Sequence, residues 1–194
     1  MTAGARGRVV ILDRDGTIVI DRGYLDDPAG LQFLPGAEQG LRRLHQQGYR
    51  LVVITNQSGI GRGLLTVQRL EEIHGRLAEM LDRAGAPLQG IYYCPHRPED
   101  DCACRKPKAK LLRDAAAALG FDPASAIVIG DKRSDVELGQ SVGALTMLVS
   151  QNGATSDGAR IDAGYVVRDL LEAARILEDP SFEAAPRRPA APGR

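Results

Sequence analysis

Aromatic residues are scarce in this chain. There is no tryptophan, and phenylalanine, tyrosine and tryptophan together make up 4% of the residues. Its 25 basic residues are matched by 25 acidic residues, so the formal net charge is +0. A nucleic-acid-binding protein usually has a basic excess, often combined with aromatic side chains on which bases stack. The composition therefore argues against a general nucleic-acid binder, but it leaves room for a local basic pocket.

Long apolar runs are absent as well. No stretch reaches the roughly 18 apolar residues that a membrane-spanning helix needs, and residues 1–7 are too short and polar for a secretory signal. We therefore expect a cytoplasmic protein with no membrane partner. Nothing indicates an obligate interface, so we expect a monomer. The 194 residues suit one domain, which we place at residues 1–178. A proline-rich, disordered tail is expected over residues 179–194.

The three cysteines lie close together in one short segment. With a neighbouring histidine they form the pattern C-x-H-x5-C-x-C, made by Cys94, His96, Cys102 and Cys104. An odd number of clustered cysteines is a poor disulfide framework. Three thiolates and one imidazole complete a tetrahedral Zn²⁺ site with no open position, which indicates a structural metal. The alternative is a set of inert, buried free cysteines. His45 and His74 are expected to lie on helix surfaces.

Short apolar runs alternate with helical patterns along the chain. Strands are predicted at Val9–Leu12, Leu51–Ile54, Ile91–Tyr93, Ile127–Ile129, Thr146–Val149 and Tyr165–Val167. Helices are predicted at Ala37–Gln47, after Thr66, and at Lys110–Leu119, Ser134–Val142 and Asp169–Leu177. This alternation predicts an α/β fold with a doubly wound, mainly parallel sheet. In such a fold, ligands bind beyond the carboxyl ends of the strands.

Polar motifs stand at these strand ends. The first is Asp13-Arg14-Asp15-Gly16-Thr17. Two carboxylates spaced by one residue can share a reaction centre, where one attacks a phosphorus atom and the other protonates the departing oxygen. An ordinary solvated turn is the alternative, because aspartate and glycine are common in turns.

Three further motifs are each ambiguous alone. The polar groups of Thr55–Gly59 suit a phosphoryl group. In Arg105-Lys106, the lysine could offset the negative charge of that group and the arginine could make forked contacts with substrate oxygens. In Gly130–Asp135, two carboxylates, Asp131 and Asp135, suit Mg²⁺. The alternatives are a polar loop, surface charge and helix capping.

Together and in this order, the four motifs resemble the haloacid dehalogenase (HAD) superfamily of phosphatases. The resemblance implies a Rossmann-like HAD fold in which Asp13 is the nucleophile and Asp15 the general acid and base. It implies that Asp13, the Asp15 backbone carbonyl and Asp131 hold Mg²⁺, with Asp135 just outside the ligands. Thr55 and Lys106 would bind the transferring phosphoryl group.

Further details resemble the D-glycero-D-manno-heptose 1,7-bisphosphate 7-phosphatase family over roughly Val9 to Val149. They are Asp21-Arg22-Gly23-Tyr24, Asn56–Ile60, Arg62-Gly63, the zinc pattern and Gly130-Asp131-Lys132. The resemblance implies a small phosphorylated sugar as substrate. Its contacts would be Asp21, Arg22, Gly23, Tyr24, Thr55, Asn56, Gln57, Ser58, Arg62, Arg105, Lys106 and Lys132. The short gaps between the catalytic motifs leave no room for a cap domain, so the zinc loop would help to wall the site.

Other functions remain open from the sequence. Histidinol-phosphate phosphatases of the same superfamily share the catalytic set and the zinc loop. Ser58 and Arg62 favour the heptose interpretation, because a bisphosphate needs an additional cationic contact, which Arg22 or Arg62 could supply. A zinc-stabilised binding module without catalysis is the alternative from another class. A P-loop kinase is excluded, since the sequence lacks the motif G-x-x-x-x-G-K-[ST].

Overall fold

The computed structural model describes residues 7–156, 158, 160–179 and 182. Six parallel strands in this part of the chain form one sheet with the order β3-β2-β1-β4-β5-β6. The strands are β1 (Val9–Leu12), β2 (Arg50–Asn56), β3 (Leu88–Cys94), β4 (Ile127–Gly130), β5 (Leu145–Val149) and β6 (Tyr165–Val167). The expected doubly wound α/β fold is confirmed.

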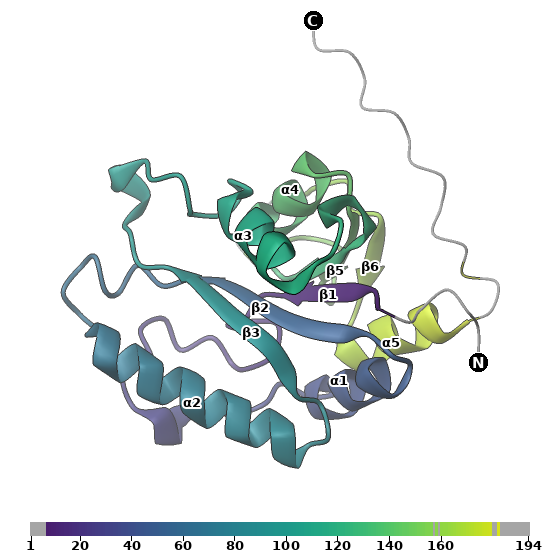
Figure 1. Cartoon of the computed structure of the whole chain (residues 1–194), viewed down its shortest axis with the longest axis horizontal. Coiled ribbons are helices and arrows are strands. Elements are labelled where there is room, and N and C mark those ends of the chain that lie inside the picture. Colours follow the sequence, from purple (N-terminus) through teal and green to yellow (C-terminus); the bar gives the residue numbers. More distant parts are fainter. Residues whose placement is uncertain (1–6, 157, 159, 180–181, 183–194) are drawn as a thin grey trace, which may run out of the picture.

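Helices cover both faces of the sheet (Figure 1). They are α1 (Ala37–Gln46), α2 (Val67–Arg83), α3 (Lys110–Leu119), α4 (Arg133–Ser141) and α5 (Leu170–Glu178). One apolar core joins α1, α2 and α5 to one face of the sheet, and a second joins α3 and α4 to the other. The alternation of buried side chains along β1, with Val10 and Leu12 in the first core and Val9 and Ile11 in the second, explains why this central strand is apolar throughout.

Element boundaries agree with the sequence prediction to within a residue or two at most ends. Thr66 caps α2 through its side chain, and Gly120 ends α3 in the left-handed conformation. The largest difference is β3, which is longer than the predicted Ile91–Tyr93. Gln89 and Gly90 interrupt the apolar run, but backbone pairing with β2 continues past them.

Two expectations concern the chain as a whole: that it has no membrane-spanning helix, and that residues 179–194 form a disordered tail. Within the described residues, no helix is long and apolar enough to cross a membrane. The expected tail over residues 179–194 falls almost entirely outside the described residues.

Candidate active site

The polar motifs converge because β1 lies between β2 and β4. Asp13 directly follows β1, Thr55 lies near the end of β2, and Asp131 directly follows β4. The backbone N–H of Asp13 donates to the carbonyl of Ile129 in β4 at 3.1 Å, which extends the pairing of β1 with β4 to the first residue after β1. The carboxyl ends of three adjacent parallel strands thus deliver their side chains to one place, as expected at the point where a doubly wound sheet reverses its strand order.

Three buried carboxylates form the centre of this site. Oxygen atoms of Asp13, Asp131 and Asp135 all lie within 4.8 Å of one another. Buried among them, the Lys106 ammonium lies 2.9 Å from Asp13 Oδ1 and 2.6 Å from Asp135 Oδ1, and it donates to the carbonyl of Ile54 at 2.8 Å. Burial acts to lower the pKa of Lys106, but the charges of Asp13 and Asp135 outweigh it and raise this pKa. Lys106 is therefore a permanent positive charge in the site.

The carboxylate cluster fits a divalent cation. Burial, and then the negative charge of Asp13, raise the pKa of Asp131. A bound cation would lower this pKa, because its positive charge favours the ionised carboxylate. The turn at Gly16 (φ +84°) brings the loop so close to Asp131 that a β-carbon at Gly16 would collide with the carboxylate. Asp135 accepts hydrogen bonds from the Lys106 ammonium and from the backbone N–H of Lys132. Both of its oxygens are thus engaged, consistent with a place just outside the ligands.

Asp15 is held on the other side of the site by an arginine fork. Arg14 Nη2 donates to Asp15 Oδ2 at 2.8 Å, and Arg14 Nε lies 3.1 Å from both carboxylate oxygens. Gln57 Nε2 adds a hydrogen bond of 3.0 Å to Asp15 Oδ2 and another of 2.8 Å to Thr55 Oγ1. The Asp15 carboxylate is therefore fixed in orientation while it lines the same cleft as Asp13.

A cleft of about 490 Å³ opens over these groups. Asp13 and Asp15 line it. So do most of the residues predicted to contact substrate: Asp21, Gly23, Tyr24, Thr55, Asn56, Gln57, Ser58, Arg105, Lys106 and Lys132. Arg22 and Arg62 lie outside this lining, within the part of the chain that the structure describes. Arg22 donates to the carbonyl of Gly30, and Arg62 pairs with Glu99 at 3.4 Å. Gly59, from the Thr55–Gly59 motif, and Ser134, predicted only as the start of a helix, also line the cleft.

Side chains at the mouth of the cleft carry both charge and an aromatic ring. Lys132 Nζ lies 3.0 Å from Asp21 Oδ2, and the charges of Asp13 and Asp131 raise the pKa of Lys132 in spite of its burial. Burial acts to raise the pKa of Asp21, but hydrogen bonds from Gly23 N–H and Lys132 bring it below its usual value. Tyr24 is about half exposed, at 49%. Cations and an aromatic ring at this edge suit a phosphorylated sugar.

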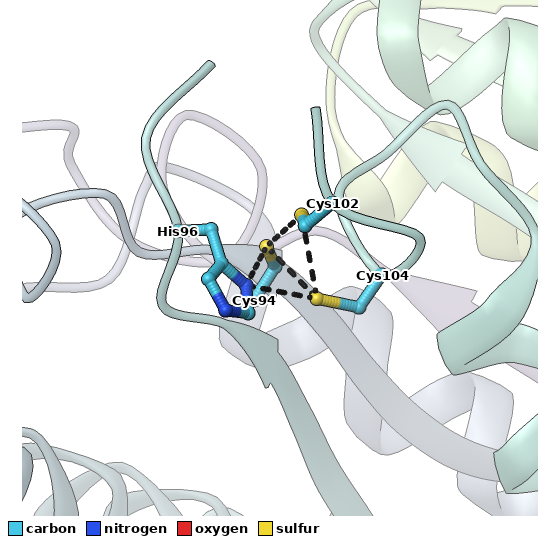
Figure 2. A group of neighbouring side chains, drawn as sticks. All are labelled: Cys94, His96, Cys102 and Cys104. Carbon is cyan, nitrogen blue, oxygen red and sulfur yellow. Dashed lines mark hydrogen bonds between the residues drawn. The ribbon is translucent and has the colours of Figure 1, made fainter. Parts of the chain in front are cut away.

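The predicted zinc ligands come together in the segment between β3 and α3 (Figure 2). Distances among the three sulfur atoms and His96 Nδ1 run from 3.2 Å for Cys104 to Cys94 up to 3.6 Å for Cys104 to Cys102. A Zn–S bond of about 2.3 Å implies S···S edges of about 3.8 Å in a tetrahedron. The cluster is therefore close to the size that the metal requires. Cys94 is the buried last residue of β3, so one ligand stands on the sheet itself.

The segment from Cys94 to Lys106, which carries the predicted zinc ligands, is hydrogen-bonded to the active-site loop at both ends. At its start, Gln57 N–H donates to the carbonyl of Cys94 at 2.7 Å. At its end, the Asn56 side chain accepts from Lys106 N–H at 3.0 Å and donates to the Lys106 carbonyl at 3.3 Å. Asn56 thus holds the backbone of Lys106, whose ammonium pairs with Asp13 and Asp135.

One expectation about the histidines is wrong. His45 is exposed on α1, but His74 is buried, at 8% exposure. Buried α2 residues Leu70, Ile73, His74, Leu77 and Leu81 follow helical spacing, so His74 occupies the stripe that faces the sheet. That spacing was visible in the sequence and would have predicted burial. Arg14, for which no role was predicted, is only 2% exposed and contacts Asp15 and Gln57. No sequence pattern indicates that an arginine will be buried.

Similarity to known proteins decides the family. A family model described as HAD-hydrolase-like matches residues 103–173. The D-glycero-beta-D-manno-heptose-1,7-bisphosphate 7-phosphatase of Haemophilus ducreyi is 38% identical over 174 residues, which cover 85% of this chain and 95% of that protein. This chain belongs to the heptose-1,7-bisphosphate 7-phosphatase family. A protein of the same name from Helicobacter pylori (strain J99) is 43% identical over 133 residues, or 68% of this chain and 76% of that protein.

Solved structures of the heptose-bisphosphate phosphatase family have the same fold. The D,D-heptose 1,7-bisphosphate phosphatase from B. bronchiseptica, complexed with magnesium and phosphate, matches with a TM-score of 0.79 and 34% identity, covering 88% of this chain and 97% of that chain. The phosphatase from Burkholderia Thailandensis matches with a TM-score of 0.66 and 29% identity, covering 89% and 99%. This chain is therefore a HAD-type phosphoric monoester hydrolase, and a non-catalytic zinc module does not fit its family.

Proposed function

We propose that this protein removes the C7 phosphate of D-glycero-D-manno-heptose 1,7-bisphosphate through a phosphorylated Asp13. The observation that carries the proposal is the juxtaposition of Asp13 with the Lys106 ammonium at 2.9 Å, beside Asp131 and in the same cleft as the fixed carboxylate of Asp15. The substrate itself is proposed from the names of the relatives, which share up to 43% of the aligned residues.

Two carboxylates divide the proposed reaction. An Asp13 oxygen attacks phosphorus, and the bond from phosphorus to the C7 oxygen breaks while that oxygen takes a proton from Asp15. Heptose 1-phosphate leaves with a free C7 hydroxyl. Water then attacks the phosphorus of the aspartyl phosphate, Asp15 takes the proton of this water, and inorganic phosphate leaves as the Asp13 carboxylate is restored. Lys106 and Thr55 offset the charge on the phosphoryl oxygens in both steps.

Two metals are part of the proposal. Asp13, Asp131 and the backbone carbonyl of Asp15 would hold Mg²⁺, which supplies charge neutralisation for the phosphoryl oxygens. The structure complexed with magnesium and phosphate supports this choice of metal. Cys94, His96, Cys102 and Cys104 would hold a structural Zn²⁺.

Substrate contacts are proposed from the lining of the cleft. Arg105 and Lys132 would bind oxygens of the substrate, and Tyr24 with the Asp21–Gly23 turn would contact the sugar. Arg22 and Arg62, which point to partners outside the cleft, would not reach the substrate without a rearrangement.

Phosphate release from heptose 1,7-bisphosphate and from histidinol phosphate, measured side by side, tests the substrate. We expect the heptose to be strongly preferred. Activity should be lost after removal of Mg²⁺ and restored by Mg²⁺ alone, and ³¹P NMR should show loss of the C7 signal with the C1 signal retained. A preference for histidinol phosphate would overturn the substrate assignment and keep the mechanism. Asp13→Asn is the control, because it removes the attacking oxygen; we expect it to lose at least about 10³-fold in kcat while it stays folded.

A further inference from the structure

Arg14 is the largest of the fully buried side chains in the described residues, and it plays no part in the chemical steps above. Burying a guanidinium is costly unless hydrogen-bond acceptors match its N–H groups. Its Nε and Nη2 are matched by Asp15 and by Gln57 Oε1, the latter at 3.0 Å. The remaining contact is unusual, since Arg14 Nη1 lies 3.3 Å from His74 Nε2.

The contact with His74 defines the state of the imidazole ring. A guanidinium has donors and no acceptor, so Nε2 of His74 has to accept the hydrogen bond, which requires a neutral ring with its proton on Nδ1. Burial, and then the charge of Arg14, lower the pKa of His74 to about 3. The ring also packs edge-on against Tyr93 of β3, with 5.6 Å between centroids. His74 is therefore a rigid, neutral acceptor seated between α2 and the sheet.

A chain of fixed groups leads from this histidine to the cleft. His74 accepts a hydrogen bond from the guanidinium of Arg14, and this guanidinium donates to both oxygens of Asp15. Gln57 closes the arrangement, because it accepts from Arg14 and donates to Asp15 Oδ2. A carboxylate held this way loses little freedom at the moment of proton transfer, and proton transfer is sensitive to misplacement.

We propose that Arg14 and His74 are positioning residues that hold the Asp15 carboxylate in line with the leaving oxygen. The inference rests on the proposed function, in which Asp15 protonates that oxygen. It assigns the buried histidine of α2, which touches neither substrate nor metal ligands, a role in the reaction. It also gives a reason for a histidine on the otherwise apolar stripe of α2.

The dependence of kcat/KM on the leaving group tests the proposal. Protonation matters for an alkyl phosphate, whose alkoxide leaves poorly, and matters little for p-nitrophenyl phosphate, so a misplaced acid steepens the plot of log(kcat/KM) against leaving-group pKa. We expect His74→Phe, which keeps a ring and loses the acceptor, to be about tenfold slower on alkyl phosphates and less than about twofold slower on p-nitrophenyl phosphate. His74→Gln, which restores an acceptor, should recover most of the loss.

Two further variants keep the test decisive. Arg14→Lys retains the charge without the fork, and it should steepen the plot at least as much as His74→Phe. His45→Phe makes the same chemical change on the exposed face of α1 and should leave the slope unchanged. Since the slope is independent of the fraction of active protein, a partly unfolded variant still gives an answer.

Asp15→Asn separates failure of the inference from failure of the proposed function. A steep plot for Asp15→Asn with an unchanged slope in His74→Phe and Arg14→Lys would overturn the inference alone. An unchanged slope in these two variants means equal losses on both substrate classes, which is the result expected of a merely structural role. An unchanged slope in Asp15→Asn would instead overturn the acid role of Asp15 in the proposed function.

Discussion

Two histidines show how far surroundings alter a single residue. His45 is exposed on α1, whereas His74 is buried on α2 against Arg14 and Tyr93. Burial penalises the charged imidazolium, and the neighbouring guanidinium penalises it further, so the pKa of His74 lies far below its usual value. The same residue type thus serves as an ordinary surface group in one helix and as a fixed hydrogen-bond acceptor in another.

The buried histidine makes stability depend on pH. The pKa of His74 is about 3 in the folded protein and 6.5 in the unfolded chain. Below pH 6.5 the unfolded chain therefore takes up a proton that the folded protein refuses. As the pH is lowered below 6.5, the free energy of unfolding therefore decreases, by at most about 1.4 kcal/mol per pH unit, until the pH reaches the pKa of the folded protein.

Urea unfolding at about pH 7 and about pH 5.5 measures this effect. We expect wild type to lose about 1 kcal/mol more than His74→Gln between the two values, because the glutamine takes up no proton. His45→Gln should lose as much as wild type. Equal losses in wild type and His74→Gln would show that the folded protein admits the proton.

At the scale of elements, the segment between β3 and α3 carries the Cys/His cluster that we propose to bind zinc. Its side chains Arg97, Glu99, Asp100 and Asp101 are charged and cannot form a core. Its ends are nevertheless fixed, because Cys94 closes β3 and Asn56 clamps the Lys106 backbone. Order in this segment therefore determines where Lys106 stands relative to Asp13.

Loss of one thiolate tests this dependence. We expect Cys102→Ser to bind less than one zinc per chain, to melt at a lower temperature and to lose at least about tenfold in kcat/KM, since a shift of about 1 Å in a catalytic group can cost about 10²-fold. Metal content, thermal unfolding and phosphate release measure the three effects. Ala103→Ser is the matched control, because it adds a hydroxyl to the same turn and removes no ligand. Full zinc content with unchanged melting in Cys102→Ser would contradict the ligand set.

At the scale of the whole molecule, strand order brings the site together, and few large hydrophobic side chains are exposed among the described residues. Among the described residues, the exposed large hydrophobic side chains are Tyr24, Leu64, Val67 and Val166. Val166 lies on edge strand β6, whereas Val67 begins α2, which packs at the opposite edge against β3. These side chains therefore do not form one large apolar face of the kind that a stable interface of about 800 Å² per partner requires.

We accordingly predict a monomer in solution. Light scattering coupled to size-exclusion chromatography should give a mass near 20.8 kDa, independent of loading concentration. Zinc-loaded protein is the appropriate sample, and the Cys102→Ser variant serves as a comparison for association through a loosened loop. A mass of about twice that value in the wild type would contradict the prediction and indicate a stable dimer.

The sequence by itself determined the fold class, the strand ends and the grouping of the three cysteines with His96. Apolar runs ending in Asp13, Thr55 and Asp131 need only local periodicity to be recognised, and the four residues proposed to bind zinc are close enough in sequence for their spacing to predict the cluster. Only the tertiary structure decided how side chains far apart in sequence are paired. It buried Arg14 against His74, engaged Asn56 with Lys106 and turned Arg22 and Arg62 away from the cleft. Such pairings depend on which helix face meets which strand end, and long polar side chains carry no local signal of the partner they will find.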